Sequence, residues 1–450
     1  MKKIYNKLEN FTGFLPNFSY FFSSNVISYF FSFFIIVFFA RTYSSELFGK
    51  FTIAQTIFFI IFSMSFSNIH YYLNKSLSLN FDKRRREIGS CFLITFYASV
   101  ILYVTLAIFL TFIEIDQDLK NLILILNLII ISEPFSIFYS ELFVRGQFNI
   151  IFRIKFLQNI IFLLIKLFII LNKIDYIFLA LAYFLENVFF SLVVIYYFKK
   201  NGNKFQNLIF SYEYTLKIIK KIILFPLLAF AFLISMRVDV LMISNLLGVD
   251  YAGYYSATSR IITIILLFGT HFFQFIYPNL NRISYDKQKF TDIYKNLIFL
   301  SIITGIVTYL LALILGSSYL KLFGNEFLIV LNSLKILSIN VAAALIINLW
   351  VHKQYVFSKY KQILFFQTST ILLNITLNYY LINFFGINGA ALATSLAAIL
   401  SFIIINIHQP REFLLIFSSF SPIKQKRVAS EILKTILVNR NPEKIEKNKD

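Results

Sequence analysis

The chain has 450 residues, of which 58% are hydrophobic and only 14% are charged, and its net charge is +20. Soluble domains carry roughly 25% charged residues, so this sequence lacks the polar side chains that a water-facing surface needs. Its basic residues lie in short segments between apolar blocks, which argues against a nucleic-acid partner. The one cysteine, Cys91, lies in an apolar run, so we expect an inert buried thiol and no disulfide within the chain.

The apolar residues come in blocks of about twenty, the length of helix that crosses ~30 Å of hydrocarbon. We therefore predict an all-α integral membrane protein with about twelve transmembrane helices, arranged as two six-helix bundles around a central cavity. The predicted spans are 19–40, 51–73, 89–113, 122–140, 150–171, 176–198, 222–247, 254–277, 296–317, 327–351, 362–382 and 387–407.

The positions of lysine and arginine between these spans give an independent test of the count. If the N-terminus is cytoplasmic, 33 of these residues fall in cytoplasmic segments and 5 in the loops on the opposite side. The positive-inside rule requires this kind of asymmetry, and one missed span would reverse it for the rest of the chain. Both termini are therefore predicted to be cytoplasmic, and the expected location is the inner membrane of a bacterial cell.

The widest cytoplasmic connection divides the predicted spans into two sets of six. We predict an N-terminal six-helix bundle at 1–198, a cytoplasmic linker at 199–221, a C-terminal six-helix bundle at 222–410 and a basic cytoplasmic tail at 411–450. Within the tail, 423–438 has the pattern of an amphipathic helix on an anionic membrane surface.

A short internal repeat supports this division. The pattern acid-x-x-Gly-x-aromatic begins at Glu46, after the first predicted span, and again at Asp250, after the seventh, 204 residues later. Both copies occupy the turn between the first two helices of a half. A parallel repeat of six spans predicts a cavity between two bundles, as in alternating-access transporters.

Seven ionisable residues lie well inside the predicted spans, although each costs about 2.5–3.5 kcal/mol at the centre of a span. They are Glu133, Lys166, Glu186, Arg237, Asp239, Arg260 and Lys335. At 1.5 Å per residue, the four cations fall about 8–15 Å below the outer boundary, and the two glutamates lie nearer the midplane. Asp239 and Arg260 have similar depths on adjacent antiparallel spans, so they are the best candidate ion pair.

Two interpretations of these charges stay open. In the functional interpretation, cavity cations bind an anionic substrate group and an acid exchanges a proton or a sodium ion. The candidate cations are Arg237, Arg260, Lys335, Lys166 and Arg41, and the candidate acids are Asp239, Glu133 and Glu186. In the structural interpretation, the charges pair to fix helix packing, and Lys166 extends toward the outer headgroups.

The sequence contains no motif typical of a zinc hydrolase, a serine hydrolase or a nucleotide-binding loop. We therefore predict a transporter and not an enzyme, without metal or cofactor, and not driven directly by ATP. Pro134, Pro226 and Pro278 are expected to kink or end helices. The small residues at 386–393 predict a close contact between two helices.

Three stretches carry a family resemblance: Ala40-Arg41 with 45–49, Arg237 through 247–257 to Arg260, and 385–391. They resemble Wzx-type O-antigen flippases, polysaccharide-exporting members of the multidrug/oligosaccharidyl-lipid/polysaccharide superfamily. The resemblance implies translocation of undecaprenyl-pyrophosphate-linked oligosaccharide from the cytoplasmic to the periplasmic leaflet, coupled to a gradient of H⁺ or Na⁺. The implied partners are the lipid-linked oligosaccharide, membrane lipids, a polysaccharide polymerase and a chain-length regulator of lipopolysaccharide synthesis.

Other classes of protein remain open as alternatives. A multidrug or metabolite antiporter of the same fold would need an acid-dominated cavity for cationic cargo, whereas four intramembrane cations face three acids here. A membrane-embedded polysaccharide polymerase is expected to carry a large outer loop, but the longest outer loops hold about ten residues. A membrane acyltransferase needs an intramembrane histidine with a polar partner, and His271 has none nearby in the sequence. Related peptidoglycan-precursor flippases usually have fourteen spans, from which the predicted twelve depart.

Overall fold

The computed structural model describes residues 27–66, 69–79, 83–202, 208–357, 359–407 and 415. In this part of the chain all regular structure is helical. The residues pack as two compact units. The N-terminal unit comprises 27–256 with 321–327, and the C-terminal unit comprises 257–320 with 328–407. The boundary falls within a helix, so the division of the spans at 199–221 stays a prediction.

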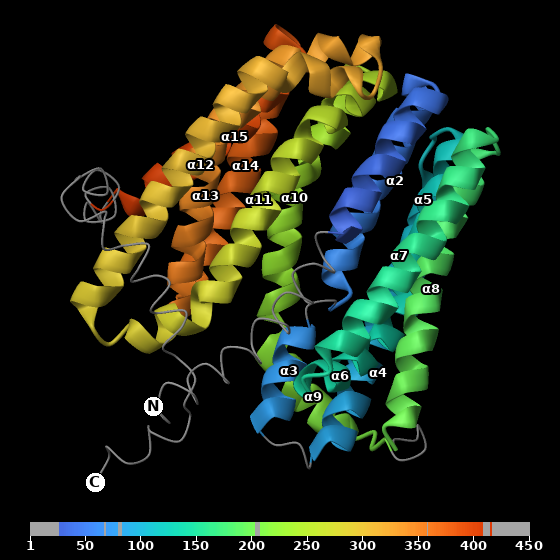
Figure 1. The fold of residues 1–450 in the computed structure, drawn as a ribbon, viewed down its shortest axis with the longest axis vertical. Coiled ribbons are helices and arrows are strands. Elements are labelled where there is room, and N and C mark those ends of the chain that lie inside the picture. The colour runs from blue at the N-terminus through green and yellow to red at the C-terminus, as the bar shows by residue number, and fades with distance from the viewer. Residues whose placement is uncertain are drawn as a thin grey trace, which may run out of the picture. The chain divides into compact units, whose positions relative to one another are not determined.

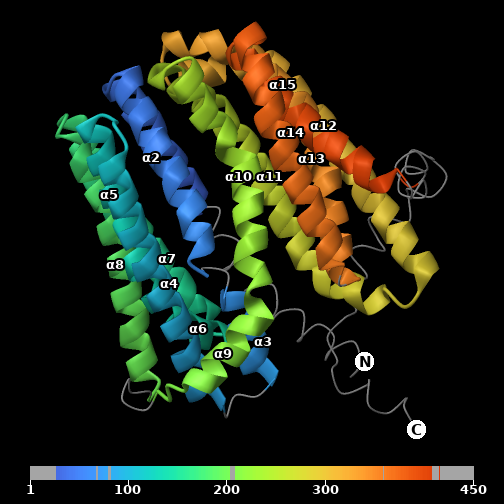
Figure 2. The same ribbon diagram turned by 180° about the vertical axis from the view of Figure 1, so that it is seen from behind.

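The N-terminal unit is built from long helices and several short ones. They are the helix Ile27–Thr42, α2 (Ser45–Met64), α3 (Ile69–Leu79), α4 (Arg84–Phe112), α5 (Gln117–Ser132), the 3-10 helix η2 (Glu133–Phe138), α6 (Tyr139–Val144), α7 (Phe148–Leu171), α8 (Tyr176–Lys200), α9 (Tyr212–Ile222) and α10 (Leu224–Leu246). Within this unit α5 packs along α2 and α8, and α7 packs along α8 (Figures 1 and 2).

Side-chain caps explain where three of these helices begin. Ser44 precedes α2 and accepts a hydrogen bond from the backbone N–H of Leu47. Asp116 precedes α5 and Asp175 precedes α8, and each carboxylate accepts an N–H of the first helical turn. Such caps satisfy donors that have no partner inside the helix. They set the starts of α2, α5 and α8 within one or two residues.

The C-terminal unit contains most of α11 (Val249–Ile283) and α12 (Lys287–Lys321), followed by η4 (Asn325–Val330), α13 (Leu331–Val356), α14 (Tyr360–Phe385) and α15 (Ile387–Asn406). Gly386 joins α14 to α15 with a φ of +57°. A Cβ on Gly389 would lie only 1.9 Å from the carbonyl oxygen of Leu381. The close helix contact predicted for 386–393 is therefore confirmed, because only glycine permits this approach.

Nine helical segments in the described residues are long and apolar enough to cross a membrane, and the helix Ile27–Thr42 is apolar but shorter. The membrane class and the helical fold are thus confirmed. Each of the twelve predicted spans overlaps a helix. The full count of twelve and the orientation of the termini stay predictions.

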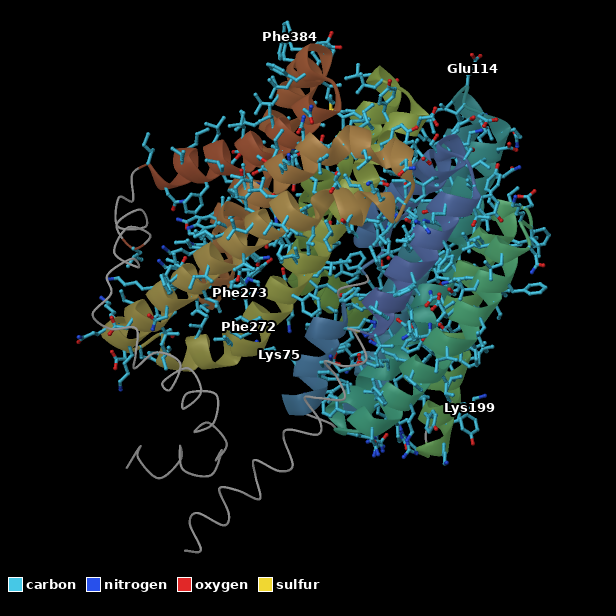
Figure 3. The ribbon with its side chains drawn as sticks, turned by 45° about the horizontal axis from the view of Figure 1, so that its top comes forward. Lys75, Glu114, Lys199, Phe272, Phe273 and Phe384 are labelled. Carbon is cyan, nitrogen blue, oxygen red and sulfur yellow. The ribbon has the colours of Figure 1, made fainter. Side chains whose placement is uncertain are left out.

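The ends of the predicted loops agree with the alternating topology. In the N-terminal unit, Lys75 and Lys199 belong to segments predicted on the cytoplasmic side, and both lie away from the end that carries Glu114 (Figure 3). Glu114 belongs to a segment predicted on the opposite side, and it lies at the other end of the same unit (Figure 3).

Two predicted spans are interrupted, which corrects the sequence interpretation. The predicted span 51–73 ends as α2 at Met64 and resumes as α3 at Ile69. The predicted span 122–140 changes from an α-helix to a 3-10 helix at Glu133, directly before Pro134. The expected effect of Pro134 is therefore confirmed.

The other two prolines lie in different settings: Pro226 directly follows the break between α9 and α10, and the kink expected at Pro278 stays a prediction. Pro226 lies in the first turn of α10, where a proline fits because its missing N–H has no partner to lose. The helix α11 continues past Pro278 to Ile283, so this proline does not end it.

The predicted linker 199–221 holds most of a short amphipathic helix, α9, which buries Thr215, Ile218 and Ile222. The predicted tail 411–450, including 423–438, lies outside the described residues except for Leu415, as do residues 19–26 of the first predicted span.

Candidate functional site

Lys166 and Glu186 form an ion pair between α7 and α8. The ammonium of Lys166 also lies 3.4 Å from the centroid of the Tyr183 ring, and only 5% of the Lys166 residue is exposed. A buried cation between a carboxylate and an aromatic face is well compensated. This geometry matches the structural interpretation of Lys166, with Glu186 and not the headgroups as its partner. A role of either residue in binding or coupling stays a prediction.

Arg237 and Asp239 on α10 contact different helices, as their spacing of two residues predicts. The guanidinium carbon of Arg237 lies 5.2 Å from the centroid of the Phe59 ring on α2. Asp239 is buried, and one of its carboxylate oxygens accepts a hydrogen bond of 2.7 Å from the hydroxyl of Tyr255 on α11. Arg260, the predicted partner of Asp239, belongs to the other unit, so this pairing stays a prediction.

Arg260 and Lys335 are both half-buried in the C-terminal unit. The hydroxyl of Tyr319 on α12 donates to the carbonyl of Ala257, one turn before Arg260, and ties α12 to this part of α11. Among the described residues of the unit, the only carboxylates are Asp286 and Asp292, which lie at the α11–α12 connection and the start of α12. The described spans of the C-terminal unit therefore hold cations and no acid.

Arg41, the fifth predicted cavity cation, is exposed and has a different contact. Its guanidinium donates to the carbonyl of Lys321, the last residue of α12, at 3.0 Å. A cation at the C-terminal end of a helix satisfies a free carbonyl and opposes the negative end of the helix dipole. This contact accounts for Arg41 without a ligand, and its place in a cavity stays a prediction.

The two copies of the sequence repeat pack against each other inside the N-terminal unit. The hydroxyl of Ser45 donates to the carboxylate of Asp250 at 3.1 Å. A Cβ on Gly49 would lie 2.1 Å from the carbonyl oxygen of Val249, and one on Gly253 would lie 3.0 Å from that of Ser45. The repeated glycine thus permits a close approach of α2 and α11, which gives the repeat a physical basis.

Glu133 lies where α5 becomes η2, and the neighbouring helix α8 compensates for this change. Asn187 donates to the Ser132 hydroxyl at 3.0 Å and to the Ile129 carbonyl at 3.3 Å. Ser191 donates to the Ser132 carbonyl at 3.3 Å. Backbone groups freed inside a membrane need such partners. The interruption at Glu133 is therefore a built feature of the fold.

A histidine from α3 reaches the same interruption. The ring nitrogens of His70 lie 3.1 Å from the hydroxyl of Ser136 and 2.9 Å from that of Ser140. The hydroxyl of Ser136 in turn donates to the Glu133 carboxylate at 3.0 Å. These four side chains form one hydrogen-bonded chain, which we call the His70 chain. It joins two predicted spans where both are interrupted.

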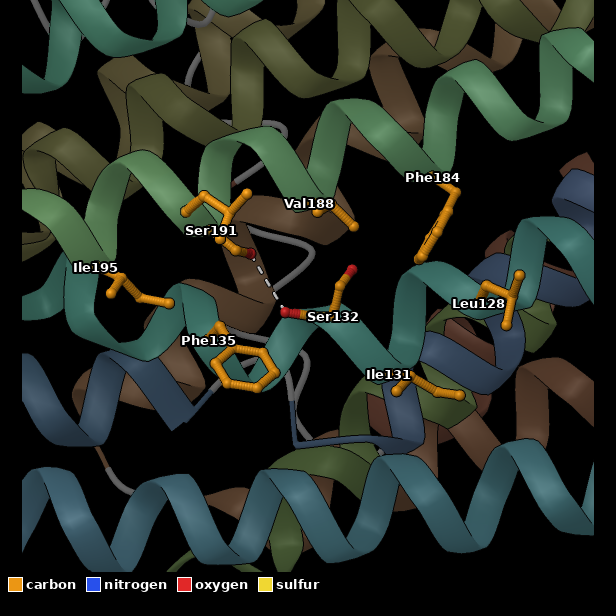
Figure 4. Close-up of a pocket in the computed structure, with 9 residues that line it drawn as sticks. Leu128, Ile131, Ser132, Phe135, Phe184, Val188, Ser191 and Ile195 are labelled. Carbon is orange, nitrogen blue, oxygen red and sulfur yellow. Dashed lines mark hydrogen bonds between the residues drawn. The ribbon is translucent and has the colours of Figure 1, made fainter. Parts of the chain in front are cut away.

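An apolar cavity of about 260 Å³ lies beside this interruption, between α5 with η2 and α8 (Figure 4). Most of its lining is aliphatic or aromatic, including Leu128, Phe135, Phe184 and Leu192. Such a lining suits hydrocarbon and offers no charge to a phosphate. The cavity is therefore unsuited to the headgroup of an anionic lipid.

The sequence interpretation missed His70, Ser136 and Ser140 as polar groups of the membrane region. The position of His70 inside the predicted span 51–73 could have identified it, since ionisable residues in transmembrane helices are rare and commonly functional. The spacing of Ser136 and Ser140 by four residues also places both on one helical face. The side chain of His271 lies outside the described residues.

The family of the protein follows from its sequence. Residues 14–284 match the family described as polysaccharide biosynthesis protein. The chain belongs to this family. Among proteins with curated descriptions, none matches the chain.

Solved structures show that this polysaccharide biosynthesis protein has a known transporter fold. It is similar to the lipid II flippase MurJ in an inward closed conformation, with a TM-score of 0.68 and 18% identity, over 94% of this chain and 97% of that one. It is also similar to an inward-facing multidrug resistance MATE family transporter of the MOP superfamily, with a TM-score of 0.68 and 13% identity, over 86% and 94% of the two chains. For the Vibrio cholerae MATE transporter VcmN in the bent form, the TM-score is 0.55 and the identity 13%, over 88% and 99%.

The family match confirms the predicted link to polysaccharide synthesis, and the solved structures show a fold shared with a lipid II flippase and with MATE transporters. The fold is that of flippases and transporters, and the family is that of polysaccharide biosynthesis.

Proposed function

We propose that this polysaccharide biosynthesis protein is a flippase that moves an undecaprenyl-pyrophosphate-linked oligosaccharide, such as an O-antigen repeat unit, from the cytoplasmic to the periplasmic leaflet. It acts in the inner membrane of a bacterium and draws on an ion gradient. Family membership and the flippase fold support a lipid-linked sugar as the cargo. A polysaccharide polymerase and a chain-length regulator then act on the product.

The charge of the C-terminal unit carries this proposal. Its described spans hold Arg260 and Lys335 and no aspartate or glutamate. Cations inside a membrane protein attract a pyrophosphate group, and arginine binds phosphate oxygens with two parallel hydrogen bonds. The polyprenyl tail needs no binding site of its own, because it is soluble in the surrounding lipid.

A multidrug antiporter is the second candidate, and the similarity to MATE transporters favours it. Cationic drugs need carboxylates in the cavity. The spans of the N-terminal unit hold Glu133, Glu186 and Asp239, whereas the described spans of the C-terminal unit hold none. The charge inventory therefore favours the flippase.

Surface polysaccharide in cells that depend on this chain tests the proposal. We expect Arg237→Ala and Arg260→Ala to abolish the polysaccharide, to leave protein levels unchanged and to accumulate lipid-linked repeat units on the cytoplasmic side. Arg→Lys at either position should restore export only partly if the guanidinium binds pyrophosphate through two hydrogen bonds. Normal polysaccharide from both alanine variants would remove both residues from the candidate ligands. Drug resistance conferred by the wild type, without any effect on polysaccharide, would favour the antiporter.

A further inference from the structure

The interruptions of the second and fourth predicted spans meet at His70. The helix α3, which begins one residue before His70, packs against α6, and α6 follows η2 directly. His70 contacts Ser136 on η2 and Ser140 on α6. In membrane transporters, interrupted helices expose polar groups at the depth where ions bind. One titratable ring therefore joins the two interrupted spans.

The backbone next to this ring is strained. Phe66, just after the end of α2, has a φ of +60°, although it is not glycine. A left-handed conformation costs a bulky residue about 1–2 kcal/mol. Such a conformation persists where the surrounding structure holds it, and functional sites are a common place for it. The interruption of the span 51–73 is thus maintained against a local cost.

The hydrogen bonds of the His70 chain have one consistent direction. The hydroxyl of Ser136 donates to Glu133, so it accepts from Nε2–H of His70. In this neutral tautomer Nδ1 has no proton, and it accepts from the hydroxyl of Ser140. Every donor in the chain therefore points toward the Glu133 carboxylate.

Glu133 differs from the other carboxylates around this chain. Among the residues that the structure describes, no lysine or arginine nitrogen lies within 4.0 Å of it. By contrast, Glu186 pairs with Lys166, and Glu141 pairs with Arg145 at 2.7 Å. Glu133 is half-buried, and a partly desolvated carboxylate without a cationic partner is stabilised by binding a proton or a cation.

The geometry points to the His70 chain as the proton-binding site that couples the proposed flippase to a proton gradient, an inference that rests on the proposed function. A proton from water binds Nδ1 of His70, and the hydroxyl of Ser140 turns to accept from it. The Nε2 proton then passes to Ser136 Oγ, while the Ser136 hydroxyl proton passes to Glu133. One proton enters, no heavy atom moves, and the carboxylate becomes neutral.

A proton suits this site better than a sodium ion. Hard metal cations are bound by several oxygen ligands. Here a ring nitrogen lies at the centre of the chain, and the hydroxyls on either side of it are already hydrogen-bonded to it. Histidine is also the side chain that most readily takes up a proton between about pH 5 and 8.

Several charged groups on the elements around the chain are engaged with other partners. Glu87 on α4 accepts from the hydroxyl of Tyr214, and burial together with Glu87 raises the pKa of Tyr214 to about 12. Further ionisable groups on α3 and on the elements packed against it and η2, besides the two pairs above, are Tyr72, Lys75, Arg84, Arg85, Arg86, Cys91, Tyr97, Tyr103, Asp118, Lys120, Tyr139, Tyr176, Tyr183, Tyr196, Tyr197, Lys199 and Lys200. The ring of Tyr139 stands edge-on to His70 with a centroid distance of 6.3 Å. The ammonium nitrogen of Lys155 on α7 also lies near this tyrosine, 5.9 Å from the centroid of its ring.

Infrared spectroscopy of the full-length protein in lipid vesicles tests proton binding without any substrate. A protonated carboxyl band that titrates with pH should disappear in Glu133→Gln and persist in Glu186→Gln. Replacing His70 by Asn should move the midpoint of this band by at least about half a pH unit, because the two groups titrate together. In a Ser136→Ala background the same replacement should have no effect on the midpoint.

Coupling is tested by the movement of undecaprenyl pyrophosphate across the same vesicles, with and without a pH gradient. We expect the pH gradient to stimulate lipid movement by the wild type and by Ser132→Ala. The stimulation should be about tenfold smaller in Ser136→Ala. Ser132 is the matched control, since it lies beside Glu133 but bonds to Asn187 and not to His70. Movement without a gradient should remain in all three proteins, which shows that they are folded.

Three outcomes would overturn the inference: full stimulation of Ser136→Ala, stimulation by a sodium gradient alone, or a carboxyl band that survives in Glu133→Gln. Failure of the wild type to move undecaprenyl pyrophosphate at all would contradict the proposed function instead. The infrared titration would still decide whether the His70 chain binds the proton.

Discussion

The two units of this protein accommodate charge inside the membrane in different ways. In the N-terminal unit, Lys166 lies against both Glu186 and the ring of Tyr183. Its buried acid Asp239 accepts a hydrogen bond from Tyr255. These charges are compensated by groups of the same unit, and their contacts hold helices together.

The C-terminal unit carries cations in its described spans and no acid to match them. Neutral side chains pair there, such as Ser333 with Asn388 at 2.8 Å and Asn348 with Thr270 at 2.6 Å. Whether an intramembrane charge is structural or a ligand candidate is therefore best judged by the counter-charges in its own unit. By this criterion Lys335, which has no carboxylate within 4.0 Å among the described residues, is a better ligand candidate than Lys166.

The largest effect is expected from breaking the pair in the N-terminal unit. Lys166→Met leaves the half-buried Glu186 without its cation, which should destabilise the protein by about 3 kcal/mol. The double variant Lys166→Met/Glu186→Leu should regain most of this stability, as measured by the unfolding temperature in detergent. An unchanged unfolding temperature for Lys166→Met together with lost export would instead make Lys166 a ligand residue.

Tyr255→Phe should destabilise the protein by about 1.5–3 kcal/mol, because the buried carboxylate of Asp239 loses its hydroxyl donor. The unfolding temperature again measures this, with Tyr285→Phe at a fully exposed position as the control. Equal stability of the two variants would show that Asp239 is compensated by other groups.

Lys335→Ala should affect transport and not stability, in contrast to Lys166→Met. We expect the unfolding temperature to stay the same while the rate of lipid translocation falls about tenfold, through loss of one charge-assisted contact of ~1.4 kcal/mol. The exposed Lys361→Ala in the same unit is the control. If Lys335→Ala destabilised the protein as strongly as Lys166→Met, the contrast between the units would be lost.

The smallest effect is expected at Arg41, which caps the end of α12. Arg41→Ala should cost about 0.3–1 kcal/mol of stability, in keeping with a charge at a helix terminus. Export of polysaccharide should be close to normal. A loss of export comparable to that of Lys335→Ala would place Arg41 in the substrate path after all.

Much of the fold could be predicted from the sequence, because membrane helices are recognisable by the length and hydropathy of their apolar segments. All twelve predicted spans overlap helices, and the repeat that begins at Glu46 and Asp250 marks turns that pack together. The interruption after Met64 was not predicted, although 63–70 contains three serines, an asparagine and a histidine. It depends on tertiary contacts of His70 with residues about seventy positions away.

The candidate site was predictable in its residue types and not in its partners. Sequence reasoning picked out Lys166 and Glu186 separately, but only the packing of α7 against α8 makes them a pair. It counted Glu133 among the acids and overlooked His70, because only the folded structure shows that Ser136 links the ring of His70 to Glu133. Partner identity is a property of the three-dimensional arrangement.

Binding of undecaprenyl pyrophosphate to the purified protein tests whether cations of the C-terminal unit receive a pyrophosphate lipid. Native mass spectrometry of the wild type, Lys335→Ala and Lys361→Ala should show tight binding by the first and the third and about tenfold weaker binding by the second. Undecaprenol, which lacks the phosphates, should bind none of them with comparable affinity. Equal binding of the pyrophosphate lipid by wild type and Lys335→Ala, or preference for a cationic dye over it, would contradict the account.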